Sequence, residues 1–119
     1  MRGSRVPLAD QEAYVPGYRE RLEHIAELCA AKNAHLLLLT QPILAPDSSD
    51  TRRIMERYNA VTKEVASARG IPLFDLASEI PQDQTYYLDG IHFSTAGAAQ
   101  VAGLVKPFLA AEVERLVVQ

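Results

Sequence analysis

Two short, unbroken apolar runs constrain the fold of this chain more than any other feature of its sequence. The first is L-L-L-L within residues 35–40, and the second is I-P-L-F-D at residues 71–75. Unbroken runs of this length are typical of strands that are covered on both faces, as in a parallel sheet. A helix is the competing interpretation of the first run, but Asn33 and Pro42 leave too little room for one.

Helical patterns flank both runs. Apolar residues at three- and four-residue spacing predict helices over residues 18–32, 52–69 and 95–116. Pro107 lies inside the last of these and is expected to kink it. The residues expected to cap or end the helices are Asn33, Ser49 or Asp50, Gly70 and Ser94.

The order of these elements predicts a single α/β domain. A strand, a helix and a second apolar strand form a right-handed parallel crossover. The 119 residues suffice for one domain and not for two. We expect an N-terminal arm or loop over residues 1–17, the domain itself over residues 18–119, and a loop over residues 76–88.

Only two strands are predicted, and two parallel strands alone leave long open edges. A sheet of this size is not stable unaided. We therefore expect that the N-terminal strands of the sheet are missing from this sequence or that another chain supplies them. An open edge of this kind also predicts self-association or pairing with a partner chain.

Charge and composition exclude several classes of protein. The net charge is −3, and no basic stripe points to nucleic-acid binding. No apolar run approaches the about 18 residues of a membrane span, and the N-terminus lacks the apolar segment of a signal peptide, so a cytoplasmic location is expected. The one cysteine, Cys29, is expected to be a buried structural thiol. No spacing predicts a metal site, and no cofactor is expected.

The strongest chemical signal is D-G-I-H, which places Asp89 three residues before His92. Gly90 allows a tight turn that would fold the carboxylate back toward Nδ1 of the imidazole. A carboxylate at Nδ1 fixes the tautomer of the ring and leaves Nε2 free to act as a general base. The alternative is that both residues are only turn and capping residues before the last helix.

The longer run D-G-I-H-F-S-T-A-G-A-A-Q-V-A resembles the final motif of the SGNH (GDSL-type) hydrolases. The upstream order of elements is similar as well, over residues 18–110. This resemblance implies a three-layer, flavodoxin-like fold and a serine ester hydrolase. It also implies that His92 is the general base and that Asp89 orients it.

The chain departs from that family at the nucleophile. It contains no G-D-S motif and no G-x-N-D motif, from which the family draws its serine and its oxyanion hole. Local serines have simpler interpretations: Ser94 as a helix cap, and Ser48 and Ser49 as loop and cap residues. The chain therefore resembles the C-terminal portion of such an enzyme.

Two functions follow as expectations. The first is hydrolysis of a small-molecule ester through an acyl-enzyme, with little activity in the isolated chain because the nucleophile motif is absent. The second is a non-catalytic remnant or interaction module that pairs through its open sheet edge. Gln41 and Pro42 end the first strand at the expected site and are weaker candidates for lining a substrate pocket, with plain strand termination as the alternative.

Overall fold

The computed structural model describes residues 13–45 and 49–118 of the chain. Within them the elements follow the predicted order of helix, strand, helix, strand and helix, with two short additions before the last helix. The elements are α2 (Val15–Ala31), β1 (Leu38–Leu39), α3 (Asp50–Arg69), β2 (Leu73–Phe74), α4 (Leu76–Glu79), the 3₁₀ turn η1 (Gln84–Tyr86) and α5 (Thr95–Val117).

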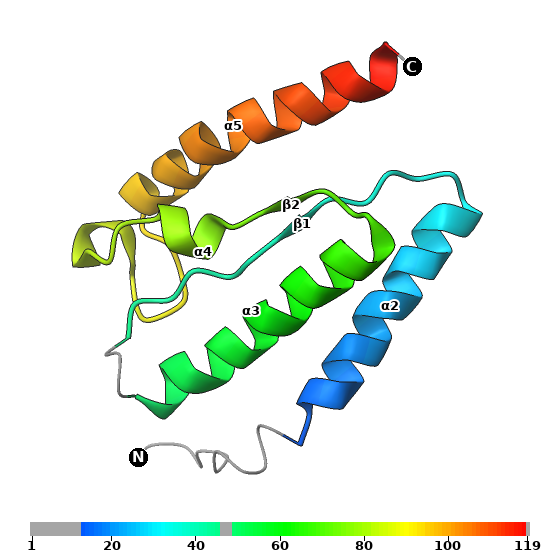
Figure 1. Cartoon of the computed structure of the whole chain (residues 1–119). Helices are drawn as coiled ribbons and strands as arrows, with labels where there is room; N and C mark the ends of the chain where they lie inside the picture. The colour runs from blue at the N-terminus through cyan, green and yellow to red at the C-terminus, as the bar shows by residue number, and fades with distance from the viewer. Residues whose placement is uncertain (1–12, 46–48, 119) are drawn as a thin grey trace.

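The two strands form the parallel pair that the apolar runs predict. Leu38 is in register with Leu73, and Leu39 is in register with Phe74. Among the described residues the sheet has these two strands and no more, so each strand has one open edge. The fold is therefore α/β, as predicted. Figure 1 shows α5 on one side of the strands and α2 and α3 on the other.

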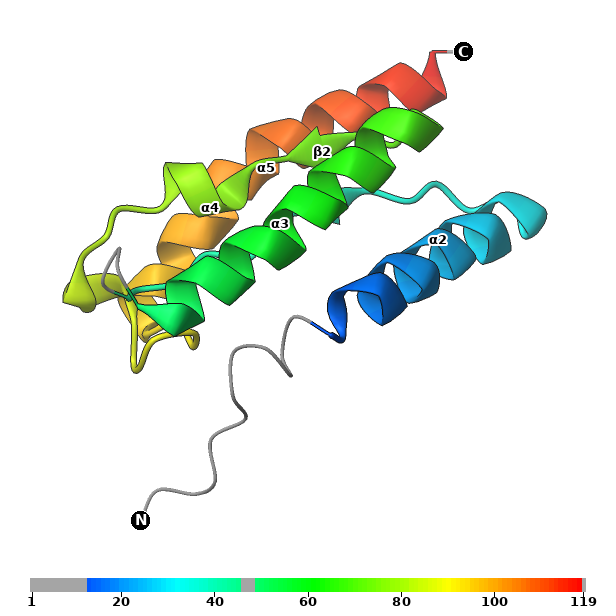
Figure 2. The ribbon, with the colours of Figure 1, turned by 60° about the horizontal axis from the view of Figure 1, so that its bottom comes forward.

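Two hydrophobic clusters occupy the two sides of the strand pair. The cluster beside α2 and α3 contains Leu38 from β1 together with Val61 and Val65 from α3. The cluster beside α5 is built on Leu76 and Tyr87, with Phe74 packed against it. Residues that alternate along a strand point to opposite faces, which is why neighbouring strand residues enter different clusters. Both figures show α2 running alongside α3 (Figures 1 and 2).

Caps explain where the long helices begin and end. The Ser49 hydroxyl accepts the Arg52 backbone N–H and starts α3, and Gly70 ends it in a left-handed conformation at φ 65°. Asn33 follows α2 with φ 60°, as expected of an asparagine after a helix. Ser94 starts α5 by accepting the backbone N–H of Gly97. These cap predictions are confirmed.

Three boundaries differ from prediction. The helix α2 begins at Val15, inside the expected arm, because proline is tolerated in a first helical turn. Each strand is shorter than its apolar run. The segment 76–88, expected to be loop, contains α4 and η1.

The helix α5 includes Pro107. No helix in the described part of the chain is long and apolar enough to cross a membrane.

Candidate active site

Asp89 and His92 lie in a tight turn that is closed at both ends. The Leu88 N–H donates to the carbonyl of His92, and Tyr87 and Phe93 form an antiparallel bridge beneath this bond. Both rings at the base of the turn pack in the cluster beside α5. The buried aromatic base thus holds the turn, and its polar tip faces outward.

The Asp89 carboxylate folds back over the turn and uses both of its oxygens. Oδ1 accepts the backbone N–H groups of Ile91 and His92, at 2.8 and 2.7 Å. Oδ2 lies 2.7 Å from Nδ1 of His92. The structure therefore brings together the two residues that the sequence singled out, in the arrangement expected of a base and its orienter.

Gly90 lies in the turn between Asp89 and His92, and its φ lies outside the left-handed region. What matters at this position is the lack of a side chain. A Cβ at this position would be 3.3 Å from the Leu44 carbonyl oxygen. The Gly90 carbonyl accepts the Leu44 N–H at 2.8 Å. The loop after β1 therefore passes close to this glycine, and a side chain here would have to displace the Leu44 carbonyl by a few tenths of an ångström.

These hydrogen bonds lower the pKa of Asp89. The N–H of Ile91 is the largest cause, followed by the His92 side chain and the His92 N–H, and together they take the pKa from 3.8 to about 2. Because the folded pKa is depressed, the stabilisation from Asp89 is complete above about pH 4. It is lost as the pH falls from there through about 2.

We therefore expect the turn to loosen between about pH 4 and pH 2. The carboxyl carbon resonance of Asp89, followed by NMR, should titrate with a midpoint near 2. The backbone resonances of Ile91 and His92 should move with it, because their N–H groups bind the carboxylate. A midpoint near 3.8, the ordinary value, would contradict this account of the turn.

The pair is open to solvent. The side chain of His92 is 69 % exposed and that of Asp89 is 56 % exposed. The helix α5 starts directly behind the pair, where Gly97 passes so close to the chain that a Cβ would lie 1.9 Å from the Tyr86 carbonyl oxygen. The imidazole of His92 is thus largely exposed while its Nδ1 is bound by Asp89.

A family profile matches most of the sequence. The profile describes the GDSL-like lipase/acylhydrolase family, and it matches residues 3–100, which include Asp89 and His92. The chain belongs to the GDSL-like lipase/acylhydrolase family. The resemblance seen in the D-G-I-H segment is thereby confirmed. No curated protein and no solved structure matches the chain.

In this GDSL-like chain a second loop supports the turn that holds Asp89 and His92. Leu44, which binds Gly90, lies in the segment after β1, and two side chains hold the carbonyls on either side of it. Arg52 Nε donates to the Ala45 carbonyl at 2.9 Å, and Gln82 Nε2 donates to the Ile43 carbonyl at 2.9 Å. A guanidinium N–H of Arg52 also donates to the Gln82 side chain. We call Arg52 and Gln82 the loop brace.

The loop brace was not predicted. The side chain of Arg52 is only 15 % exposed. No local spacing signals such a contact, because the two carbonyls come from an irregular loop whose path is set by tertiary structure. Arg52 is therefore a residue that holds the loop.

Replacing Arg52 by alanine should lower the free energy of unfolding by about 1 kcal/mol, since it removes a partly buried hydrogen bond to the Ala45 carbonyl and an exposed one to the Gln82 side chain. The neighbouring Arg53 is the matched control, because its one ion pair with Asp50 is exposed. We expect Arg53→Ala to cost less than about 0.5 kcal/mol. Equal losses in urea denaturation would contradict a role for the brace.

Gln41 and Pro42 lie at the end of β1, as predicted. The backbone N–H and carbonyl of Gln41 bind the side-chain amide of Asn59 in α3, at 2.8 and 3.0 Å. Gln41 lines a hollow of about 390 Å³ beside α3, and Pro42 is buried. The structure thus ties Gln41 to α3. A role of either residue in lining a substrate pocket stays a prediction.

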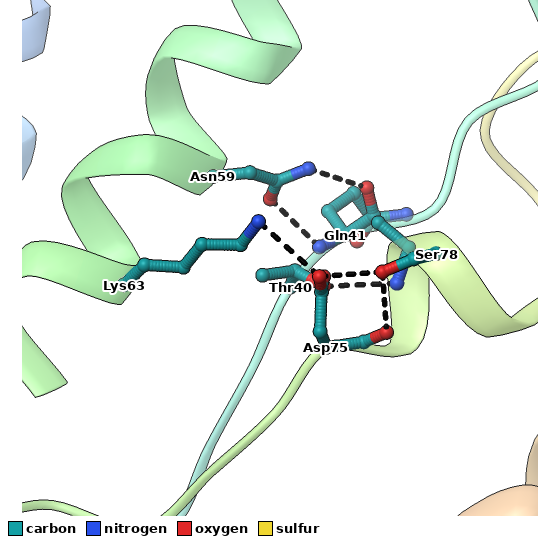
Figure 3. A network of polar contacts seen from close by, with 7 residues as sticks. Thr40, Gln41, Asn59, Lys63, Asp75 and Ser78 are labelled. Carbon is teal, nitrogen blue, oxygen red and sulfur yellow. Dashed lines mark hydrogen bonds and ion pairs between the residues drawn. The ribbon is translucent and has the colours of Figure 1, made fainter.

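A polar network joins the carboxyl ends of the two strands (Figure 3). Thr40, 2 % exposed, donates to Asp75 Oδ1 at 2.6 Å and accepts the Ala77 N–H at 2.8 Å. Asp75 Oδ2 accepts from Ser78 and lies 3.2 Å from Lys63 Nζ. Burial alone would raise the pKa of Asp75, but the bonds from Ser78, Thr40 and Lys63 hold it below its ordinary value.

Three of the four described serines are engaged in capping or in this network. The Ser94 hydroxyl donates to the Thr85 carbonyl at 2.6 Å, Ser49 caps α3, and Ser78 binds Asp75. Ser67 is exposed on α3, and Ser48 lies outside the described residues. Within the described ranges no three His, Cys, Asp or Glu side chains gather as metal ligands would. Cys29 is only partly buried, which corrects the expectation of a fully buried thiol.

Proposed function

We propose that this chain carries the general-base half of a serine ester hydrolase. One observation supports the proposal above all: Oδ2 of Asp89 lies 2.7 Å from Nδ1 of His92, and the His92 side chain is 69 % exposed. Family membership supports ester hydrolysis in general. The catalytic roles of the two residues are part of the proposal.

The proposed reaction has two steps. Nε2 of His92 takes the proton of a serine hydroxyl as the serine oxygen bonds to the ester carbonyl carbon, and the alcohol leaves with that proton. His92 then deprotonates water, whose oxygen bonds to the acyl carbon, and returns that proton to the serine oxygen as the bond between serine and the acyl group breaks and the acid is released. Asp89 keeps the imidazole proton on Nδ1 and stabilises the imidazolium that forms in each step.

The serine is proposed to come from a polypeptide segment outside the described residues, because the sequence contains no G-D-S. The same segment would extend the sheet. We propose that β1 and β2 belong to a larger, three-layer flavodoxin-like sheet. Two observations support this arrangement: β1 has an open edge, and a hydrophobic cluster lies on each side of the strand pair. The isolated chain should accordingly hydrolyse esters poorly.

Labelling with a fluorophosphonate tests the proposal. The chain would be labelled alone and after extension by the in-frame coding sequence upstream of Met1. We expect a serine in the extended protein to be labelled, and we expect His92→Ala to abolish the labelling. His24→Ala, which changes an exposed histidine on α2, should have no effect. Labelling that survives His92→Ala, or none in a folded sample, would contradict the proposal.

A second candidate is an interaction module that pairs through its sheet edge. The open edge of β1, with Leu39 exposed beside it, favours this alternative. An edge of this kind presents unpaired backbone groups to a partner strand. The absence of fluorophosphonate labelling in a folded sample would favour the module over the hydrolase.

A further inference from the structure

The outer face of α5 is apolar although nothing in the described chain covers it. The inner face packs on the cluster of Leu76 and Tyr87 through Val101, Leu104 and Val105. The outer face presents Leu109, Val113 and Val117, which are 43, 58 and 75 % exposed. An exposed apolar face of this kind marks an interaction site.

The hollow along this face carries one cation and one anion. Lys106 and Glu114 line it together with the apolar residues, and the volume is about 790 Å³. Neither side chain has an ion-pair partner in the described part of the chain. Eight residues of helix separate them by about 12 Å along the axis, so they cannot pair with each other.

The two charges are placed symmetrically about Ala110, four residues on either side. We propose that a second copy of this chain docks on α5 in antiparallel orientation, with Ala110 at the twofold axis. Lys106 of one copy then meets Glu114 of the other, and the same pair recurs at the opposite end. A twofold contact requires such self-complementarity, and the small Ala110 side chain lets the two helices approach closely.

This dimer is independent of the proposed hydrolase, since it uses neither Asp89 nor His92. Light scattering after size exclusion, with the whole 119-residue chain over a range of concentrations, should give twice the monomer mass of 13.1 kDa. Val113→Glu should shift the chain to monomer because it buries a charge in the apolar contact. Circular dichroism would verify that the exposed substitution leaves the fold intact.

Charge reversal tests the antiparallel register. Lys106→Glu and Glu114→Lys should each weaken the dimer at least about tenfold, because each places like charges opposite one another twice. The double variant should restore the dissociation constant to within about threefold of the original. Arg21→Glu and Glu20→Lys, matched charge changes on α2, should have no effect.

Four results would overturn the proposal. The first three are a monomer at all concentrations, single reversals without effect, and a double variant that stays as weak as the singles. A dimer that ignores the α5 variants but dissociates on Leu39→Lys would place the contact at the β1 edge and would also overturn it.

Discussion

Replacing Asp89 by asparagine is expected to slow fluorophosphonate labelling of the serine by about 10³- to 10⁴-fold while leaving the turn folded. An asparagine keeps the oxygen that accepts the Ile91 and His92 backbone N–H groups. It replaces Oδ2 by an NH₂ group, which cannot accept the Nδ1 proton of His92. The imidazole then carries its proton on Nε2, where the base must be free. The rate of fluorophosphonate labelling in the extended protein measures the effect.

Asp83→Asn is the matched control. Asp83 accepts the Thr85 backbone N–H at 2.8 Å in a similar exposed turn, and its pKa is lowered by that bond without a histidine. The control should label at the original rate. An Asp89→Asn variant that labels as fast as Asp83→Asn would show that the carboxylate does not orient His92.

Replacing Thr40 by valine is expected to lower the free energy of unfolding by about 2–3 kcal/mol. Valine preserves the shape of the side chain but has no hydroxyl. The Ala77 N–H then loses its acceptor in a buried site, and Asp75 loses one of its hydrogen bonds. Unfolding in urea, followed by circular dichroism, measures the change.

Thr40→Ser separates the hydroxyl from the methyl group. Serine retains both hydrogen bonds, so it should cost only about 1 kcal/mol for the lost methyl group. If serine proves as destabilising as valine, packing of the methyl group would explain the stability at this position, and the network of Figure 3 would not.

The elements that the sequence predicted best are those with strong local signals. The helices α3 and α5 could be predicted from a long stretch of apolar residues at helical spacing and from a capping residue at the start. A capping side chain binds free backbone groups, so it marks the helix start in the sequence. The helix α4 has four residues, too few to show a period. β1 is shorter than its apolar run, and beyond its end the backbone of Gln41 pairs with the side chain of Asn59.

In the candidate site, too, local features could be predicted from the sequence and long-range contacts could not. Asp89 and His92 are three residues apart, and a turn alone brings their side chains together, so the sequence could indicate the pair. Arg52 lies 37 residues before Asp89 and reaches the turn through the Ala45 carbonyl and Leu44. A side chain that binds a loop carbonyl leaves no pattern in the sequence. Its role follows only from the three-dimensional path of the loop.

The central claim is that Asp89 holds His92 with its proton on Nδ1 and leaves Nε2 as the base. The ¹⁵N chemical shifts of the His92 ring, measured on the chain at a pH where the ring is neutral, test this directly. We predict a protonated Nδ1 and an unprotonated Nε2, with the preference lost in Asp89→Asn. A neutral ring that carries its proton on Nε2 in the unsubstituted chain would contradict the account.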